Sequence, residues 1–126
     1  MAALIAKWNA CTFCADVHGA VAAKHIGSAT VDAALRDYRA APISEGLKKT
    51  LAYLEIMTLR PGELAEEDIK AVLGSGISAD SLTDAIAIGT VFNLIAGYAS
   101  ALDFSVLTPA RRHRVAETLV RVGYRL

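Results

Sequence analysis

Residues 9–18 read Asn9-Ala10-Cys11-Thr12-Phe13-Cys14-Ala15-Asp16-Val17-His18. Two cysteines stand three positions apart, and a histidine follows four positions after the second cysteine. Because an α-helix turns by about 100° per residue, these three side chains would lie within roughly 60° of one another on a helix. The helical pattern continues to His25, and Gly27 is a typical C-terminal stop. The stretch therefore predicts a helix over residues 12–25, at the start of which two thiols and an imidazole form one stripe.

The rest of the chain is typical of helices joined by short linkers. Apolar residues recur at helical spacing, and Thr30, Ser44, Ser78 and Thr108 stand where N-caps are expected. Besides a helix tail over residues 1–8, we expect about six helices and no strand, at residues 12–25, 30–38, 44–59, 64–73, 78–102 and 108–122. No repeat or low-complexity tract divides the chain, so we expect one all-α domain over residues 1–126.

Composition and charge narrow the classes of function. Hydrophobic residues make up 54% of the 126 residues, and 13 basic residues balance 13 acidic ones. A neutral chain has no general attraction for nucleic acid, and we interpret the single basic run, residues 111–114, as a solvated helix face or a source of salt bridges. We therefore expect no nucleic-acid partner. A neutral, apolar-rich small protein also tends to self-associate, so we expect a homo-oligomer.

An uncharged segment over residues 85–102 lies between Asp84 and Asp103. Its length is near the lower limit for a membrane span, but it contains Thr90 and Asn93 and lacks flanking basic or aromatic anchors. We interpret it as a buried central helix and expect no membrane partner. The N-terminus lacks the basic region of a secretory signal, so we expect a cytoplasmic protein. In that compartment, a close cysteine pair is more often catalytic or metal-binding than a structural disulfide.

The chemistry expected at residues 11–18 is redox chemistry of thiols. A helix N-terminus favours a thiolate, His18 can accept or donate the proton, and a second thiol can resolve an oxidised first one. We therefore expect Cys11, Cys14 and His18 to be catalytic, with a Cys14 pKa below that of a free thiol. Asn93 and Asp16 are candidates for groups that support the site.

The same residues have three other interpretations. Both cysteines can be small buried apolar residues with His18 at a polar rim. A zinc site would have ligands in Cys11, Cys14 and His18, with His25 further along the helix, but the chain has no second cysteine pair. Covalent haem attachment requires a histidine directly after the second cysteine, where Ala15 stands. We expect no metal and no cofactor.

Residues 9–18 closely resemble the signature of the AhpD-like family, which includes the carboxymuconolactone decarboxylases. The similarity continues, as a pattern of helix lengths, to about Phe104. It implies an all-helical fold, homo-oligomers such as trimers or hexamers, and alkylhydroperoxidase or related dithiol activity. The substrate would be a hydroperoxide or a disulfide, and an external thiol would be the reductant. The resemblance also implies that Cys14 attacks the peroxide, that Cys11 resolves the intermediate and that His18 relays protons.

The chain departs from the family pattern at two positions. Peroxidase members carry a glutamate about three helical turns before the first cysteine, a position that precedes Met1, so we expect the chain to start within the family's preceding helix. Some of those members have a histidine directly before the second cysteine, where Phe13 stands here. Two alternatives remain: a non-enzymatic module for helical oligomerisation or redox sensing, and a carboxymuconolactone decarboxylase-type activity, although that branch usually lacks the dithiol.

Overall fold

The structure is a computed structural model that describes residues 1–123. These residues form seven α-helices and one short 3-10 helix, with no strand among them, which confirms the all-α prediction. The first segment, expected as the tail of a helix, is the seventh helix of the described residues. The elements are α1 (Ala2–Trp8), α2 (Thr12–Ile26), α3 (Ser28–Asp37), α4 (Glu45–Leu59), η1 (Pro61–Glu63), α5 (Glu66–Leu73), α6 (Ala79–Ala101) and α7 (Pro109–Val122).

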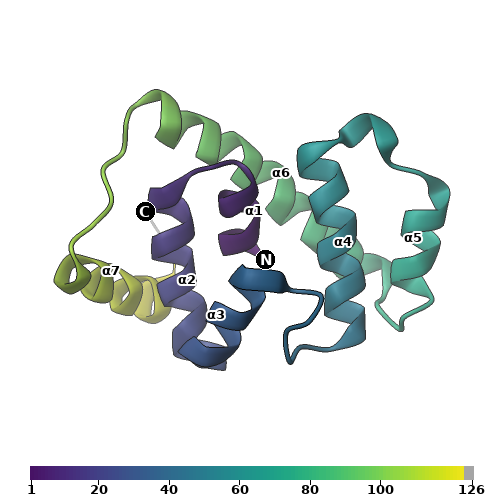
Figure 1. Cartoon of the computed structure of the whole chain (residues 1–126), viewed down its shortest axis with the longest axis horizontal. Coiled ribbons are helices and arrows are strands. Elements are labelled where there is room, and N and C mark those ends of the chain that lie inside the picture. The colour runs from purple at the N-terminus through teal and green to yellow at the C-terminus, as the bar shows by residue number, and fades with distance from the viewer. Residues whose placement is uncertain (124–126) are drawn as a thin grey trace.

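The short helix α1 lies at the centre of the molecule, where it contacts α2, α3, α4 and α6 (Figure 1). Ile5 and Ala6 on this helix are fully buried. Ile5 joins the main apolar core with Tyr53, Leu54 and other side chains of α4, α5 and α6. Ala6 belongs to a separate cluster that contains both cysteines. The central helix thus connects the main core with the thiols.

Local signals set most helix starts, as the sequence predicts. The side chain of Ser44 accepts a hydrogen bond from the Leu47 N–H at 3.2 Å, and Ser78 and Thr108 cap α6 and α7 in the same way. The expected cap at Thr30 is wrong, because α3 already begins at Ser28. Gly27 adopts a φ of +81°, a value that favours glycine, and lets the chain reverse between α2 and α3 without a longer linker.

Helix α6 runs across the molecule from the α4–α5 side to the side of α2 (Figure 1). The expectation that it is buried is wrong for the single chain. Its buried positions are Leu82, Ala85, Gly89, Ala96 and Ala99. Phe92 still packs against the main core, but most other positions in the second half of α6 are exposed. By length and composition, α6 is also apolar enough to cross a membrane.

Candidate dithiol site

A tight turn between α1 and α2 positions the first cysteine. Ala10 adopts a positive φ of 55°, and the Cys11 N–H donates to the Ala6 carbonyl oxygen at 2.9 Å. Cys11 is the N-cap of α2, and its Sγ accepts a hydrogen bond from the Cys14 N–H at 3.3 Å. The Cys11 sulfur therefore occupies the position in which a serine or aspartate oxygen usually caps a helix. A negative charge on this sulfur would be stabilised by the peptide N–H and by the helix dipole.

Both thiols are reduced and lie under the second half of α6. Cys11 is 4% exposed and Cys14 is 2% exposed. They pack with Ala6 of α1 and with Ala96 and Ala99 of α6. The small side chains of α6 let that helix lie close above the sulfur atoms. The site is therefore a dry pair of adjacent thiols rather than an open cleft.

Burial changes the acidity of the second thiol. The pKa of Cys14 is raised to about 12, first by burial, then by a hydrogen bond to Cys11 and by the negative charge of an ionised Cys11. The Cys14 peptide N–H acts in the opposite direction and is outweighed. The expectation of a lowered Cys14 pKa is therefore wrong: the helix N-terminus is present, but desolvation dominates it. Cys14 is therefore protonated at neutral pH.

His18 lies one turn beyond Cys14 on α2 and is partly buried. Its ring packs edge-on against Phe92 of α6, with 4.6 Å between the ring centroids. Burial lowers the pKa of His18, and the positive charge of the amino terminus lowers it further. The imidazole is therefore neutral at pH 7, which suits a proton acceptor and excludes a standing imidazolium beside the thiols.

We predict that His18→Ala slows thiol alkylation at neutral pH. A neutral imidazole at i+4 from Cys14 shares its helix face and can accept a thiol proton. The pH at which iodoacetamide reaches half its maximal rate should rise by about one unit, equivalent to ~1.4 kcal/mol. His25→Ala is the matched control, because His25 is an exposed histidine on the same helix. If the alkylation rate depends on pH in the same way in His18→Ala and in wild type, His18 has only a packing role.

Asn93 supports the dithiol turn from α6. Its Oδ1 accepts a hydrogen bond of 2.7 Å from Nδ2 of Asn9, and the same nitrogen donates to the Ile5 carbonyl oxygen at 2.9 Å. The pair ties α6 to the end of α1, two residues before Cys11. The sequence identifies Asn93 as a candidate supporting residue, but Asn9 was not predicted. The position of Asn9 at the end of the first helix, two residues before Cys11, is the signal that could have indicated it.

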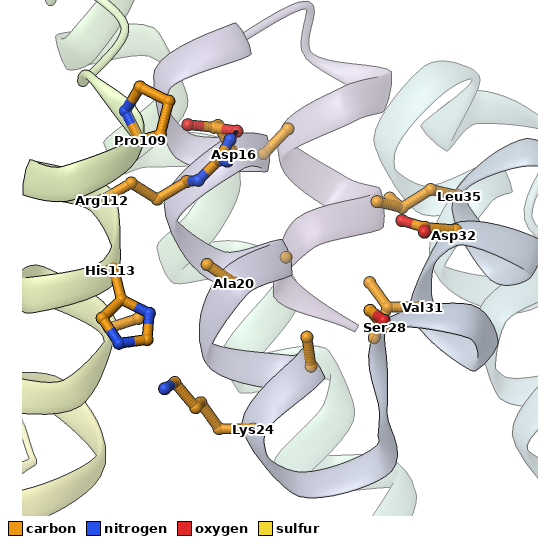
Figure 2. Close-up of a pocket in the computed structure, with 14 residues that line it drawn as sticks. Asp16, Ala20, Lys24, Ser28, Val31, Asp32, Leu35, Pro109, Arg112 and His113 are labelled. Atoms are coloured by element: carbon orange, nitrogen blue, oxygen red, sulfur yellow. Dashed lines mark hydrogen bonds and ion pairs between the residues drawn. The ribbon is translucent and has the colours of Figure 1, made fainter.

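Asp16 does not join the thiols. Its carboxylate forms an ion pair with Arg112 of α7, on the side of α2 that faces a pocket of about 460 Å³ between α2, α3 and α7 (Figure 2). Its second oxygen is buried without a hydrogen-bond partner among residues 1–123. On the same basic run, His113 contacts Glu117 at 3.1 Å. Asp16 thus holds α7 against α2, and the basic run supplies salt bridges.

The zinc interpretation finds no ligand set in the described part of the chain. Residues 1–123 contain no group of three or more histidine, cysteine, aspartate or glutamate side chains placed to hold a metal ion. His25, the fourth ligand that zinc would need, is exposed at the far end of α2. Within the described residues, these side chains therefore do not come together as the zinc interpretation requires.

Comparison with known proteins adds no relative. No protein-family model matches the chain, and no curated protein sequence matches it. The resemblance to the AhpD-like family is thus carried by residues 9–18 and by the pattern of helix lengths.

Proposed function

We propose that this protein is a dithiol–disulfide oxidoreductase that reduces a hydroperoxide through Cys11 and Cys14. The observation that carries the proposal is the capping geometry: the Cys11 sulfur accepts the Cys14 N–H at 3.3 Å, and the Cys14 thiol hydrogen-bonds to Cys11. The two sulfur atoms are therefore adjacent, as a nucleophile and a resolving thiol must be.

The geometry favours Cys11 as the attacking thiol. The family resemblance assigns the attack to Cys14, but the pKa of Cys14 is raised to about 12. A thiol with so high a pKa is protonated at neutral pH and is a poor nucleophile. Cys11 has the peptide N–H and the helix N-terminus to stabilise its thiolate. We therefore assign the first step to Cys11 and the resolving step to Cys14.

The proposed cycle is balanced in atoms and electrons. The Cys11 thiolate attacks one peroxide oxygen, the O–O bond breaks, and the alkoxide leaves as an alcohol after it takes a proton. Cys11 is then a sulfenic acid. The Cys14 sulfur attacks the Cys11 sulfur, the S–O bond breaks, and water leaves with the Cys14 proton. An external thiol reductant returns two electrons to the disulfide and restores both thiols.

The backbone at Cys11 is compatible with disulfide formation. Cys11 has φ −84° and ψ 90°, outside the helical region, while Cys14 lies in the first turn of α2. Disulfide formation therefore requires a modest shift at the cap residue and no unwinding of a helical turn. The neutral His18 imidazole, one turn further along, would accept a proton during the cycle. The proposal needs a reducing compartment, in agreement with the cytoplasmic location expected from the sequence.

The test is an anaerobic thiol count on the reduced protein before and after one equivalent of hydroperoxide. The expected result is two free thiols before and none after, with a mass loss of two hydrogen atoms and recovery of both thiols with a dithiol reductant. The Cys11→Ser, Cys14→Ser double variant is the control for hydroperoxide consumed elsewhere. Two thiols that persist in the wild type, or a mass gain of oxygen without a disulfide, would contradict the proposal.

A non-enzymatic redox sensor is the second candidate, favoured by the burial of both thiols. A sensor and an enzyme both form the disulfide, but they differ when reductant is in excess. An enzyme consumes many equivalents of hydroperoxide per chain under those conditions. A sensor instead reacts slowly and changes its association or its partner. Steady-state consumption of hydroperoxide with excess dithiol therefore separates the two.

A further inference from the structure

We infer that Phe104 closes the entrance to the dithiol site, so that a reactant reaches Cys11 and Cys14 only after the Phe104 ring has moved aside. This ring packs edge-on against the ring of Phe13, with 5.4 Å between the ring centroids and 88° between the ring planes. Phe13 stands between the two cysteines in the sequence and packs against their buried cluster. The rings of Phe13 and Phe104 together form an aromatic gate.

The turn at the end of α6 places Phe104 at the aromatic gate. Asp103 adopts a positive φ of 52°. The Asp103 N–H donates to the Ser100 carbonyl oxygen at 3.2 Å, and the Phe104 N–H donates to the Ala99 carbonyl oxygen at 3.0 Å. These two hydrogen bonds form a Schellman motif, which ends a helix and turns the chain back toward its last turn. Phe104 is therefore held close to Ala99, one of the residues that cover the thiols.

The second half of α6 is the wall of the site that can move. Ala6 of α1 forms another wall, but it is fully buried at the centre of the molecule. Asn93 is the last α6 residue, among those that the structure describes, whose side chain hydrogen-bonds to a residue outside the helix. Beyond it, Ala96 and Ala99 pack over the sulfur atoms, and the other positions are exposed. Segments with so few buried contacts open locally at low cost, so the contact between Phe13 and Phe104 fastens this end of the wall.

The surroundings of the thiols favour an uncharged reactant. Apart from the cysteines, the described residues of their cluster are alanines and Phe13, and none carries a charge. An anion that entered would lose its hydration without gaining an ion pair, and the Cys11 thiolate would repel it. The aromatic gate therefore admits small uncharged molecules in preference to anions of the same size.

The inference rests on the proposed function in that it concerns access to the same two thiols. It is tested with alkylating reagents, which react with a thiol without any hydroperoxide or disulfide chemistry. A chain with the expected alkylation rates that consumes no hydroperoxide would have the gate and lack the catalysis. A chain that consumes hydroperoxide without those rates would have the catalysis and lack the gate.

The deciding experiment is the rate at which iodoacetamide alkylates Cys11 in the reduced full chain at pH 8, with each adduct located by mass spectrometry. Phe104→Ala should raise this rate at least about fivefold, equivalent to ~1 kcal/mol, which is the size of an edge-on aromatic pair. Val106→Ala is the matched control, because Val106 lies on the same connection and is 54% exposed, against 50% for Phe104. Val106→Ala should react at the wild-type rate.

A second pair of variants tests the turn and leaves both rings in place. Asp103→Val puts a β-branched side chain at a positive φ, where it is strained, and should also raise the rate of Cys11 alkylation. Asp103→Asn removes the same charge, but asparagine tolerates this backbone conformation, so its rate should equal that of wild type. The pair therefore separates the geometry of the turn from the charge of Asp103.

Iodoacetate, an anion of nearly the same size as iodoacetamide, tests the preference for uncharged reactants. The ratio of the iodoacetamide rate to the iodoacetate rate in wild type should exceed the ratio for N-acetylcysteinamide, an uncharged model thiol, at least about tenfold. An equal ratio for the protein and the model thiol would overturn the preference.

Two results on the variants would overturn the gate itself. The first is a Phe104→Ala rate no higher than the Val106→Ala rate. The second is a rise in rate for Phe104→Ala and Asp103→Val that merely follows a lower urea midpoint, since the thiols would then be reached by unfolding of the whole chain. A faster reaction at an unchanged urea midpoint, with circular dichroism that shows intact helices, supports local opening at Phe104.

Discussion

Cys11→Ser should stop hydroperoxide reduction at its first step, with turnover at least roughly a thousandfold below wild type. Cys14→Ser should lose turnover as well, but for another reason: it makes one attack and then stops at a sulfenic acid on Cys11. The difference follows from the cap geometry. The peptide N–H at position 14 still stabilises the Cys11 thiolate after Cys14 loses its sulfur, whereas the remaining thiol in Cys11→Ser is the buried Cys14.

Two measurements on the single variants distinguish the thiols. Dimedone added after one equivalent of hydroperoxide should label Cys14→Ser and not Cys11→Ser, as read by mass spectrometry. At pH 8, iodoacetamide should also react at least roughly tenfold faster with Cys14→Ser, because the pKa of Cys14 is raised by burial as well as by Cys11. A dimedone adduct found only in Cys11→Ser would contradict this assignment. It would show that Cys14 is the attacking thiol, as the family resemblance implies.

The prediction succeeded where the signal is local. The caps at Ser44, Ser78 and Thr108 need only a side-chain oxygen and the three residues that follow, all of which are adjacent in the sequence. The pairing of Cys11 with Cys14 is equally local, because the Cys11 side chain caps α2 and accepts the Cys14 N–H three residues later. The amino-acid sequence is therefore sufficient to predict these features.

The errors at the dithiol site concern contacts between distant parts of the chain. The pKa of Cys14 depends on burial beneath Ala96 and Ala99, more than 80 residues away, and the sequence around Cys14 carries no trace of it. Asn93 pairs with Asn9 across 84 positions, and Asp16 pairs with Arg112 across 96. Composition predicts that such groups find partners but does not predict which ones.

The error on α6 has a different physical origin. An uncharged run of residues predicts that a helix avoids water, but not what covers it. In the single chain, the α6 side chains that pack against the main core end at Phe92, and large apolar side chains that follow it, such as Leu94 and Tyr98, are exposed.

Gly89→Leu should destabilise the fold by about 3 kcal/mol, at the upper end of the range for overpacked cores. Gly89 is buried where α6 crosses α4. A Cβ there would lie 2.5 Å from Cε of Met57 and 3.1 Å from Cδ2 of Leu54. The Met57 methyl is the end of a flexible side chain and can move. Leu54 is fully buried and cannot, so a leucine at position 89 forces the helices apart.

Two effects of opposite sign act at Gly89, and their sizes decide the outcome. Replacing a mid-helix glycine by leucine gains up to about 1 kcal/mol of helix propensity. The clash acts on the main core, around Leu54 and Ile5, and outweighs that gain.

The measurement is urea unfolding followed by circular dichroism. Ala87→Leu is the control, an exposed site on the same helix where a change within about 0.5 kcal/mol is expected. Equal urea midpoints for Gly89→Leu and Ala87→Leu would show that α6 can move away from α4 at little cost. The close crossing at Gly89 would then not be what holds the second half of α6 over Cys11 and Cys14.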